Sequence, residues 1–205
     1  MSKKVVKTCF EFQFDSMIMA IIPEQYGSKL YSRVLKTDGE VLIPYSPLEV
    51  IKKSCHLYAS SFEGRKEGTK ELIGVTHKPP IVIDPIQSIY FFPTASPKQR
   101  HCMWISHSHV LAYNNAGSLN TEVIFTNKMR LQVPMSCGSF DKQMLRTALL
   151  KTKIDPRFIQ AERNRQILYQ RFEQGLEAME RRSHYDVSLD EPFGRSYWSS
   201  NRLNK

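Results

Sequence analysis

Residues 30–58 read LYSRVLKTDGEVLIPYSPLEVIKKSCHLY, and this stretch decides the kind of fold. Apolar-rich runs at 30–35 and 41–43 flank Thr37-Asp38-Gly39-Glu40, a four-residue turn with Asp-Gly at its centre. Asp-Gly between two strand-like runs is a strong signal for a tight β-hairpin. The stretch therefore begins with two antiparallel strands.

A helix is predicted directly after this hairpin. Ser46 is of the type that caps helices, Pro47 suits the first helical position, and Glu49 stands where a capping box needs a carboxylate. Leu48 and the apolar residues that follow it fall on one side at helical spacing. We predict a helix from about Pro47 to Tyr58.

The rest of the first 133 residues has the pattern of strands and turns. Phe10, Phe12 and Phe14 alternate with polar residues, and a second run at 17–22 precedes a predicted loop at Pro23–Ser28. Further strands are predicted at 69–75, 81–83, 88–92, 102–110, 121–126 and 129–133, with Asn127-Lys128 as a tight turn.

The C-terminal third changes to a helical pattern. Ser139 can cap a helix that ends near 153, and Asp155-Pro156 has the types of a new N-cap and first position. We predict an α+β fold: a mainly antiparallel β-sheet with one early helix and a helical C-terminal segment. The expected divisions are a core at 1–153, a basic helix at 154–183 and a disordered tail at 184–205.

The chain is strongly basic. Its 205 residues carry a net charge of +9 with a sequence pI near 9.4, and residues 142–182 alone hold ten basic and five acidic side chains. Such a charge favours phosphate-rich partners or anionic surfaces. A basic amphipathic helix can equally be a solvated face, and both interpretations stay open here.

The four cysteines and the N-terminus indicate a cytoplasmic protein. Cys9, Cys55, Cys102 and Cys137 are single and widely spaced, unlike the framework of a small disulfide-rich secreted domain. Charged residues interrupt the stretch after Met1, so we expect no signal peptide. The longest apolar run, 17–22, is too short to span a bilayer, and we expect no membrane partner.

The most unusual local sequence is the segment Ser60–Thr69, SSFEGRKEGT, in which two glycines bracket Arg65-Lys66. Glycine lets a backbone approach a phosphate closely, and an arginine can enter a narrow A·T-rich minor groove. The alternative is a solvated loop between a helix and a strand. From charge and context, the candidate contacts to nucleic acid are Ser60, Ser61, Gly64, Arg65, Lys66, Gly68, Thr69, Lys70, Lys78 and Arg100.

Catalysis finds little support in the sequence. Cys102, His107 and His109 suggest a zinc site, but their spacing fits no common pattern, and histidines packed on a sheet are the better interpretation. Cys102 next to His101 is the one candidate nucleophile, although neighbours in sequence need not face each other. No motif of the common hydrolases, metalloproteases or nucleotide-binding enzymes is present. We therefore predict a non-enzymatic protein without cofactor or metal.

Four ordered motifs give a specific resemblance. They are SSFEGRKEGT at 60–69, HKPPIVIDP at 77–85, IYFFPT at 89–94 and CMWISHSHV at 102–110. In order, gaps and cores they resemble the ComK family of competence transcription factors of Gram-positive bacteria. The similarity runs from about Pro47 to Thr152.

The resemblance implies a DNA-binding activator of genes for DNA uptake. Its expected partners are double-stranded DNA with paired A-tract and T-tract boxes bound through the minor groove, further copies of itself as a dimer or tetramer, and RNA polymerase. It also implies an adaptor for proteolysis that binds an apolar-aromatic segment, for which this chain offers Ile167, Leu168 and Tyr169 without the expected proline-lysine. The competing interpretation is a protein-interaction module whose basic helix binds an acidic partner.

Overall fold

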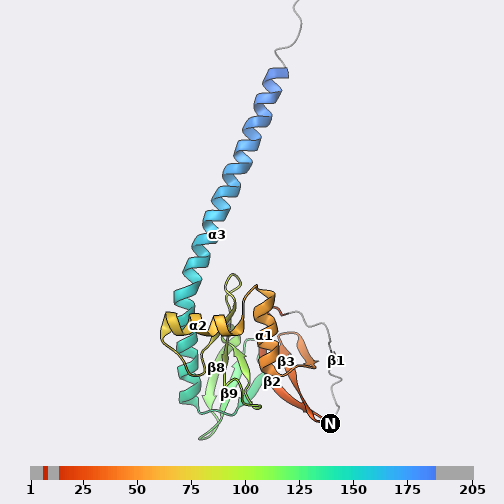
Figure 1. Cartoon of the computed structure of the whole chain (residues 1–205), viewed down its shortest axis with the longest axis vertical. Helices are drawn as coiled ribbons and strands as arrows, with labels where there is room; N and C mark the ends of the chain where they lie inside the picture. Colours follow the sequence, from red (N-terminus) through yellow and green to blue (C-terminus); the bar gives the residue numbers. More distant parts are fainter. Residues whose placement is uncertain (1–6, 9–13, 188–205) are drawn as a thin grey trace, which may run out of the picture. The chain divides into compact units, whose positions relative to one another are not determined.

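The computed structural model describes residues 7–8 and 14–187 and confirms the α+β fold (Figure 1). The chain divides into two compact units, Met1–Ile159 and Gln160–Lys205. The elements, in order, are β1 (Lys7–Thr8), β2 (Ile18–Tyr26), β3 (Lys29–Lys36), β4 (Gly39–Ile43), α1 (Pro47–Leu57), α2 (Phe62–Ile73), β5 (Ile81–Asp84), β6 (Ile89–Pro93), β7 (Trp104–Ser106), η1 (His107–His109), β8 (Val110–Asn115), β9 (Thr121–Phe125), β10 (Arg130–Val133) and α3 (Cys137–Val187).

Two sheets form the β part of the first unit. The larger has seven strands in the order β1-β4-β3-β2-β7-β6-β5, and the smaller has three in the order β10-β9-β8. Every pairing is antiparallel except that of β1 with β4. The mainly antiparallel sheet predicted from the alternating runs is therefore confirmed.

The first hairpin and helix form where the sequence predicts them. Lys36 pairs with Gly39, so Thr37 and Asp38 form a two-residue turn that lies one residue earlier than predicted. Helix α1 begins at Pro47, and the Glu49 amide donates to Ser46 Oγ at 3.4 Å while the Ser46 amide donates to Glu49 Oε2 at 2.7 Å. These reciprocal bonds satisfy free backbone donors of the first turn.

Helix α2 corrects two predictions. Residues 69–75 were expected as a strand and Ser60–Thr69 as a loop, so only one early helix was predicted, yet α2 spans Phe62–Ile73. Ser61 caps it by accepting from the Gly64 amide at 3.0 Å, and Gly74 ends it in the left-handed region at φ +70°. Gly64 and Gly68 have a low helix propensity, so the sequence did not indicate a helix here. Packing of this short amphipathic helix stabilises it nevertheless.

Two strand boundaries also differ from the prediction. The expected loop at Pro23–Ser28 is mostly strand, because β2 continues to Tyr26 and only Gly27-Ser28 turns. Pro23 is tolerated because, among the residues that the structure describes, β7 pairs with β2 at Ala20 and Ile21 and does not extend to Pro23. The single strand expected at 102–110 is divided into β7, the short 3-10 helix η1 and the start of β8.

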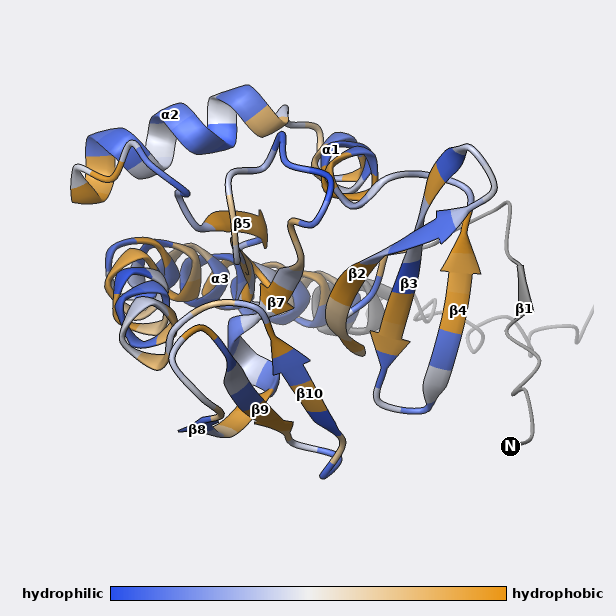
Figure 2. Ribbon diagram, turned by 90° about the horizontal axis from the view of Figure 1, so that it is seen from below, coloured by the Kyte–Doolittle hydropathy of each residue, from blue (hydrophilic) through white to orange (hydrophobic). Residues whose placement is uncertain are grey.

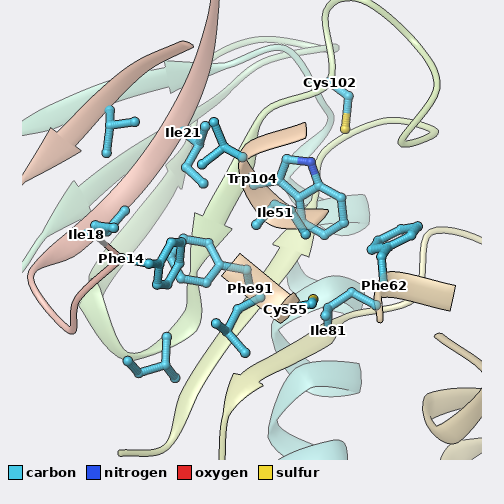
Figure 3. Close-up of a cluster of buried hydrophobic side chains, with 14 of the residues drawn as sticks. Phe14, Ile18, Ile21, Ile51, Cys55, Phe62, Ile81, Phe91, Cys102 and Trp104 are labelled. Atoms are coloured by element: carbon cyan, nitrogen blue, oxygen red, sulfur yellow. The ribbon is translucent and has the colours of Figure 1, made fainter. Parts of the chain in front are cut away.

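Both faces of the seven-stranded sheet are covered. On one face, α1 and Phe62 of α2 pack over a cluster in which Phe62 meets Trp104 edge-on at 6.1 Å between ring centroids (Figure 3). On the other face, the three-stranded sheet and Phe140 of α3 enclose Phe92 and Ile105. Figure 2 shows α2 largely hydrophilic, with hydrophobic residues at its two ends.

Helix α3 corrects the prediction of two separate helices. It runs without interruption from Cys137 to Val187 and contains Pro156 in its interior. Asp155 does not cap a new helix, because its carboxylate accepts from the Tyr90 hydroxyl at 2.5 Å and from the Ser88 hydroxyl at 2.7 Å. The tail was expected to begin at 184, but 184–187 is helical; residues 188–205, like the Phe10 and Phe12 of the first predicted strand, lie outside the described part.

Candidate nucleic-acid interface

Arg65, the central residue of the predicted contact segment, turns towards the core. It is half-buried, its Nη2 lies 3.5 Å from the Ile83 carbonyl, and its Nε is buried with no hydrogen-bond partner in the described part of the chain. Its charge lies close enough to Cys55 and Tyr90 to oppose the rise in their pKa values that burial causes. Arg65 therefore joins α2 to the sheet.

The other polar residues of this segment divide between fold and surface. Thr69 is buried and donates to the carbonyls of Arg65 and Pro80 at 3.0 and 2.9 Å. Lys66 pairs with Glu63 at 3.2 Å, and Ser61 is occupied by the helix cap. Gly64 and Gly68 are exposed, and only at Gly68 would an added Cβ meet nothing within 4 Å.

Ser60 lies just before α2, and the three remaining predicted contacts lie on α2 and on two loops. Ser60 is half-buried at the turn that joins α1 to α2, and Lys70 is exposed on α2. Lys78 is exposed on the loop before β5, and its backbone has φ +51°. Arg100 is exposed and donates to Gln25 Oε1 at 3.3 Å, near the β2–β3 turn. Together with Arg65 and Lys66, these cations are distributed over α2 and two loops.

The charge of α2 is balanced, whereas that of the first part of α3 is not. Residues 62–73 hold three basic and three acidic side chains, net zero, and residues 137–159 hold five basic and two acidic side chains, net +3. Four of these five cations share one flank of α3, and we call them the α3 basic stripe: Lys142, Arg146, Lys153 and Arg157. None of the four forms an ion pair with another residue that the structure describes.

The α3 basic stripe was missed as a set, although the basic excess of 142–182 was noted. Its spacing of i, i+4, i+11 and i+15 places all members within an arc of roughly 60° on a helix of 3.6 residues per turn. That period is visible in the sequence, but the predicted helix break at Asp155-Pro156 divided the set. The neighbouring flank of α3 carries the buried residues Phe140, Gln143, Thr147, Leu150 and Ile154.

The proposed zinc ligands are not brought together. His107 and His109 lie in η1 instead of a strand, and no group of three potential metal ligands exists in the described residues. His109 Nε2 donates to the Ser16 carbonyl at 2.6 Å, and its Nδ1 lies 3.2 Å from the Thr126 hydroxyl. Both ring nitrogens of His109 therefore have partners within the fold.

The described cysteines are buried or half-buried free thiols. Burial raises the pKa of Cys55 to about 11, and burial likewise raises the pKa of Cys102, whose Sγ donates to the Ala95 carbonyl at 3.4 Å. A raised pKa disfavours the thiolate that nucleophilic catalysis requires. Cys9 lies outside the described residues.

The described part of the second unit is a helix with exposed apolar residues. Ile167, Leu168 and Tyr169 are 48%, 65% and 64% exposed, and Phe172 and Leu176 extend the same apolar character. Within residues 7–8 and 14–187, no helix combines the length and the apolar composition that crossing a membrane would need.

Comparison with known proteins identifies the family. A family model described as "ComK protein" matches residues 11–158, a longer stretch than the four motifs suggested. The "Competence transcription factor" of Bacillus subtilis (strain 168) is 36% identical over 157 residues, which cover 77% of this chain and 82% of that protein. No solved structure matches the chain. The chain therefore belongs to the ComK protein family.

Proposed function

We propose that this protein is a DNA-binding regulator of the transcription of competence genes. The observation that carries the proposal is the 36% identity to the competence transcription factor over most of both chains. The net charge of +9 and a run of α3 cations that form no ion pair with another described residue support a polyanionic partner. The protein acts in the cytoplasm as an activator, without catalysis and without a cofactor.

The proposed targets are paired A-tract and T-tract boxes bound largely through the minor groove. A-tracts are stiff and have a narrow minor groove whose enhanced negative potential attracts arginine and lysine. A protein that recognises groove width and deformability needs few contacts to base edges. Copies bound on spaced boxes would cooperate, and RNA polymerase would be recruited to the bent promoter.

The DNA contacts that the sequence suggests stay predictions, and the fold ranks them. Lys70, Lys78 and Arg100 are exposed and available, whereas Arg65 and Thr69 are engaged with β5 and the loop that precedes it. Ser60, Ser61, Gly64, Lys66 and Gly68 would meet DNA only if the outer side of α2 faced it.

Self-association and adaptor binding are proposed for the helix of the second unit. Exposed apolar side chains at Ile167, Leu168 and Tyr169 form a surface that a second copy or a protease adaptor could bury. These exposed apolar side chains also favour the alternative function, a protein-interaction module without sequence-specific DNA binding.

A titration on two duplexes tests the proposed function. One duplex carries paired A-tract and T-tract boxes, the other has the same length and composition in scrambled order, and both are measured at two salt concentrations. We expect a preference of about tenfold or more for the boxes, about 1.4 kcal/mol, that persists at the higher salt. If both duplexes bind with equal affinity and both lose binding at the higher salt concentration, only nonspecific charge attraction remains, and the interaction module is favoured.

A further inference from the structure

We propose that the α3 basic stripe, together with Lys78, is the surface that contacts the phosphates of duplex DNA. This inference rests on the proposed function and assigns it to a particular surface. It assigns the main phosphate contacts to this stripe instead of to the segment Ser60–Thr69.

The stripe has the dimensions of a backbone-tracking surface. From Lys142 to Arg157 the helix advances roughly 22 Å at a rise of 1.5 Å per residue. Each strand of duplex DNA carries about one phosphate per 3.4 Å of the axis, so a helix of this length can lie beside several phosphates of one strand. Lys142, Lys153 and Arg157 are exposed, and Arg146 is half-buried.

The stripe is held in place by the flank next to it. Phe140 and Leu150 are fully buried, and the Gln143 amide donates to the carbonyls of Lys78 and Pro93 at 3.0 and 2.7 Å. Near the other end, Asp155 is fixed by Tyr90 and Ser88. A helix fixed along its length presents its cations without a further cost for ordering the backbone.

Lys78 joins the stripe through its backbone. Its carbonyl accepts from the amide of Gln143, which lies on the buried flank of α3 next to the stripe, so the loop contacts α3 beside the stripe. Its φ of +51° is unfavourable for a residue with a side chain, and the strain persists because the Gln143 bond and the following Pro79-Pro80 fix the loop. The side chain of Lys78 is exposed, and its backbone is held to α3 by the Gln143 bond.

Phosphate is the ligand that this arrangement fits best. The stripe cations lack ion-pair partners among the described residues, whereas α2 is neutral and pairs Lys66 with Glu63. Cations that share one flank of a rigid helix match the regularly spaced single charges of a DNA phosphate backbone. Leu149, 47% exposed, lies between Arg146 and Lys153 and can pack against deoxyribose.

The experiment compares two charge-matched triple variants of the full chain. The stripe variant carries Lys142→Ala, Lys153→Ala and Arg157→Ala. The control variant carries Lys29→Ala, Lys52→Ala and Lys98→Ala, which remove three exposed lysines from other elements. Binding to boxed and scrambled duplexes is titrated from about 50 to 200 mM salt, and circular dichroism and urea unfolding establish that both variants are folded.

We expect the stripe variant to reduce the slope of log affinity against log salt by up to about 2.7, at about 0.9 per phosphate contact. Its affinity for both duplexes should fall about tenfold to hundredfold near physiological salt. The control variant should keep the wild-type slope. Lys78→Gly, which suits the left-handed backbone and removes one cation, should reduce the slope by about 0.9.

The outcomes separate this inference from the proposed function. A wild-type protein that prefers the boxes, with equal slopes for the stripe and control variants, overturns the stripe and leaves the function standing. A wild-type protein without box preference overturns the proposed function, whereas a slope loss confined to the stripe variant still supports the phosphate surface.

Discussion

Helix α2 and the first part of α3 both carry closely spaced cations, yet the fold uses them in opposite ways. In α2, Arg65 turns inward to the Ile83 carbonyl and Lys66 pairs with Glu63. In α3, apolar and amide side chains make the contacts with the sheets, and the α3 basic stripe has no ion pairs with described residues. An unusual local sequence is therefore a poor guide to which cations are available for a ligand.

The largest expected effect tests whether Asp155 fixes α3. Asp155→Ala removes the acceptor of both the buried Tyr90 hydroxyl and the Ser88 hydroxyl, and we expect it to lower the free energy of unfolding by about 3 kcal/mol. Ser88→Ala removes only one of the two bonds and should cost about 1 kcal/mol. Urea unfolding at pH 7 measures both. Equal small losses would show that α3 is fixed elsewhere.

The next test sets an inward arginine against an arginine of the stripe. Arg65→Ala removes a half-buried side chain whose guanidinium reaches the Ile83 carbonyl, and it should cost about 2 kcal/mol of unfolding free energy. Arg157→Ala, which removes an exposed arginine of the α3 basic stripe, should change it by no more than about 0.5 kcal/mol. Urea unfolding of the two variants under one set of conditions decides. If both lose the same stability, the contrast between the two helices is wrong.

How far the sequence predicts these elements depends on how local their causes are. The helix at Pro47 was predictable because Ser46 and Glu49 cap it within one turn. The continuity of α3 was not predictable. Asp155 does not cap a helix because it accepts hydrogen bonds from Tyr90 and Ser88, which lie more than 60 residues earlier in the chain.

The candidate site was only partly predictable for the same reason. The charge excess of 142–182 is a property of composition, and the spacing of Lys142, Arg146, Lys153 and Arg157 is visible once a continuous helix is assumed. The inward direction of Arg65 depends on β5 packing beside α2, which no pattern within residues 60–69 contains.

A smaller effect tests whether DNA approaches the outer side of α2. Gly68 is exposed in the middle of the helix and an added Cβ meets nothing, so Gly68→Ala should stabilise the protein by about 0.5–1 kcal/mol. Its affinity for boxed DNA should be unchanged. A stabilised variant with clearly weakened DNA binding would show close approach of a ligand to α2. Gly64→Ala is the contrast, because its Cβ would lie 3.2 Å from the capping Ser61 Oγ.

The smallest effect concerns the flank of α3 that faces η1. Burial there lowers the pKa of His107, the nearby charge of Lys151 lowers it further, and a hydrogen bond with the Met144 backbone opposes both. A histidine whose pKa is lower in the folded than in the unfolded state binds fewer protons when folded, so stability falls as the pH drops below the unfolded value near 6.5. We expect wild-type protein to lose more unfolding free energy between pH 7.5 and 5.5 than His107→Gln does, by a fraction of a kcal/mol. Urea unfolding at the two pH values measures the difference. Identical losses would mean that neither burial nor the charge of Lys151 lowers the pKa of His107, and that this flank of α3 is as open to solvent as the α3 basic stripe.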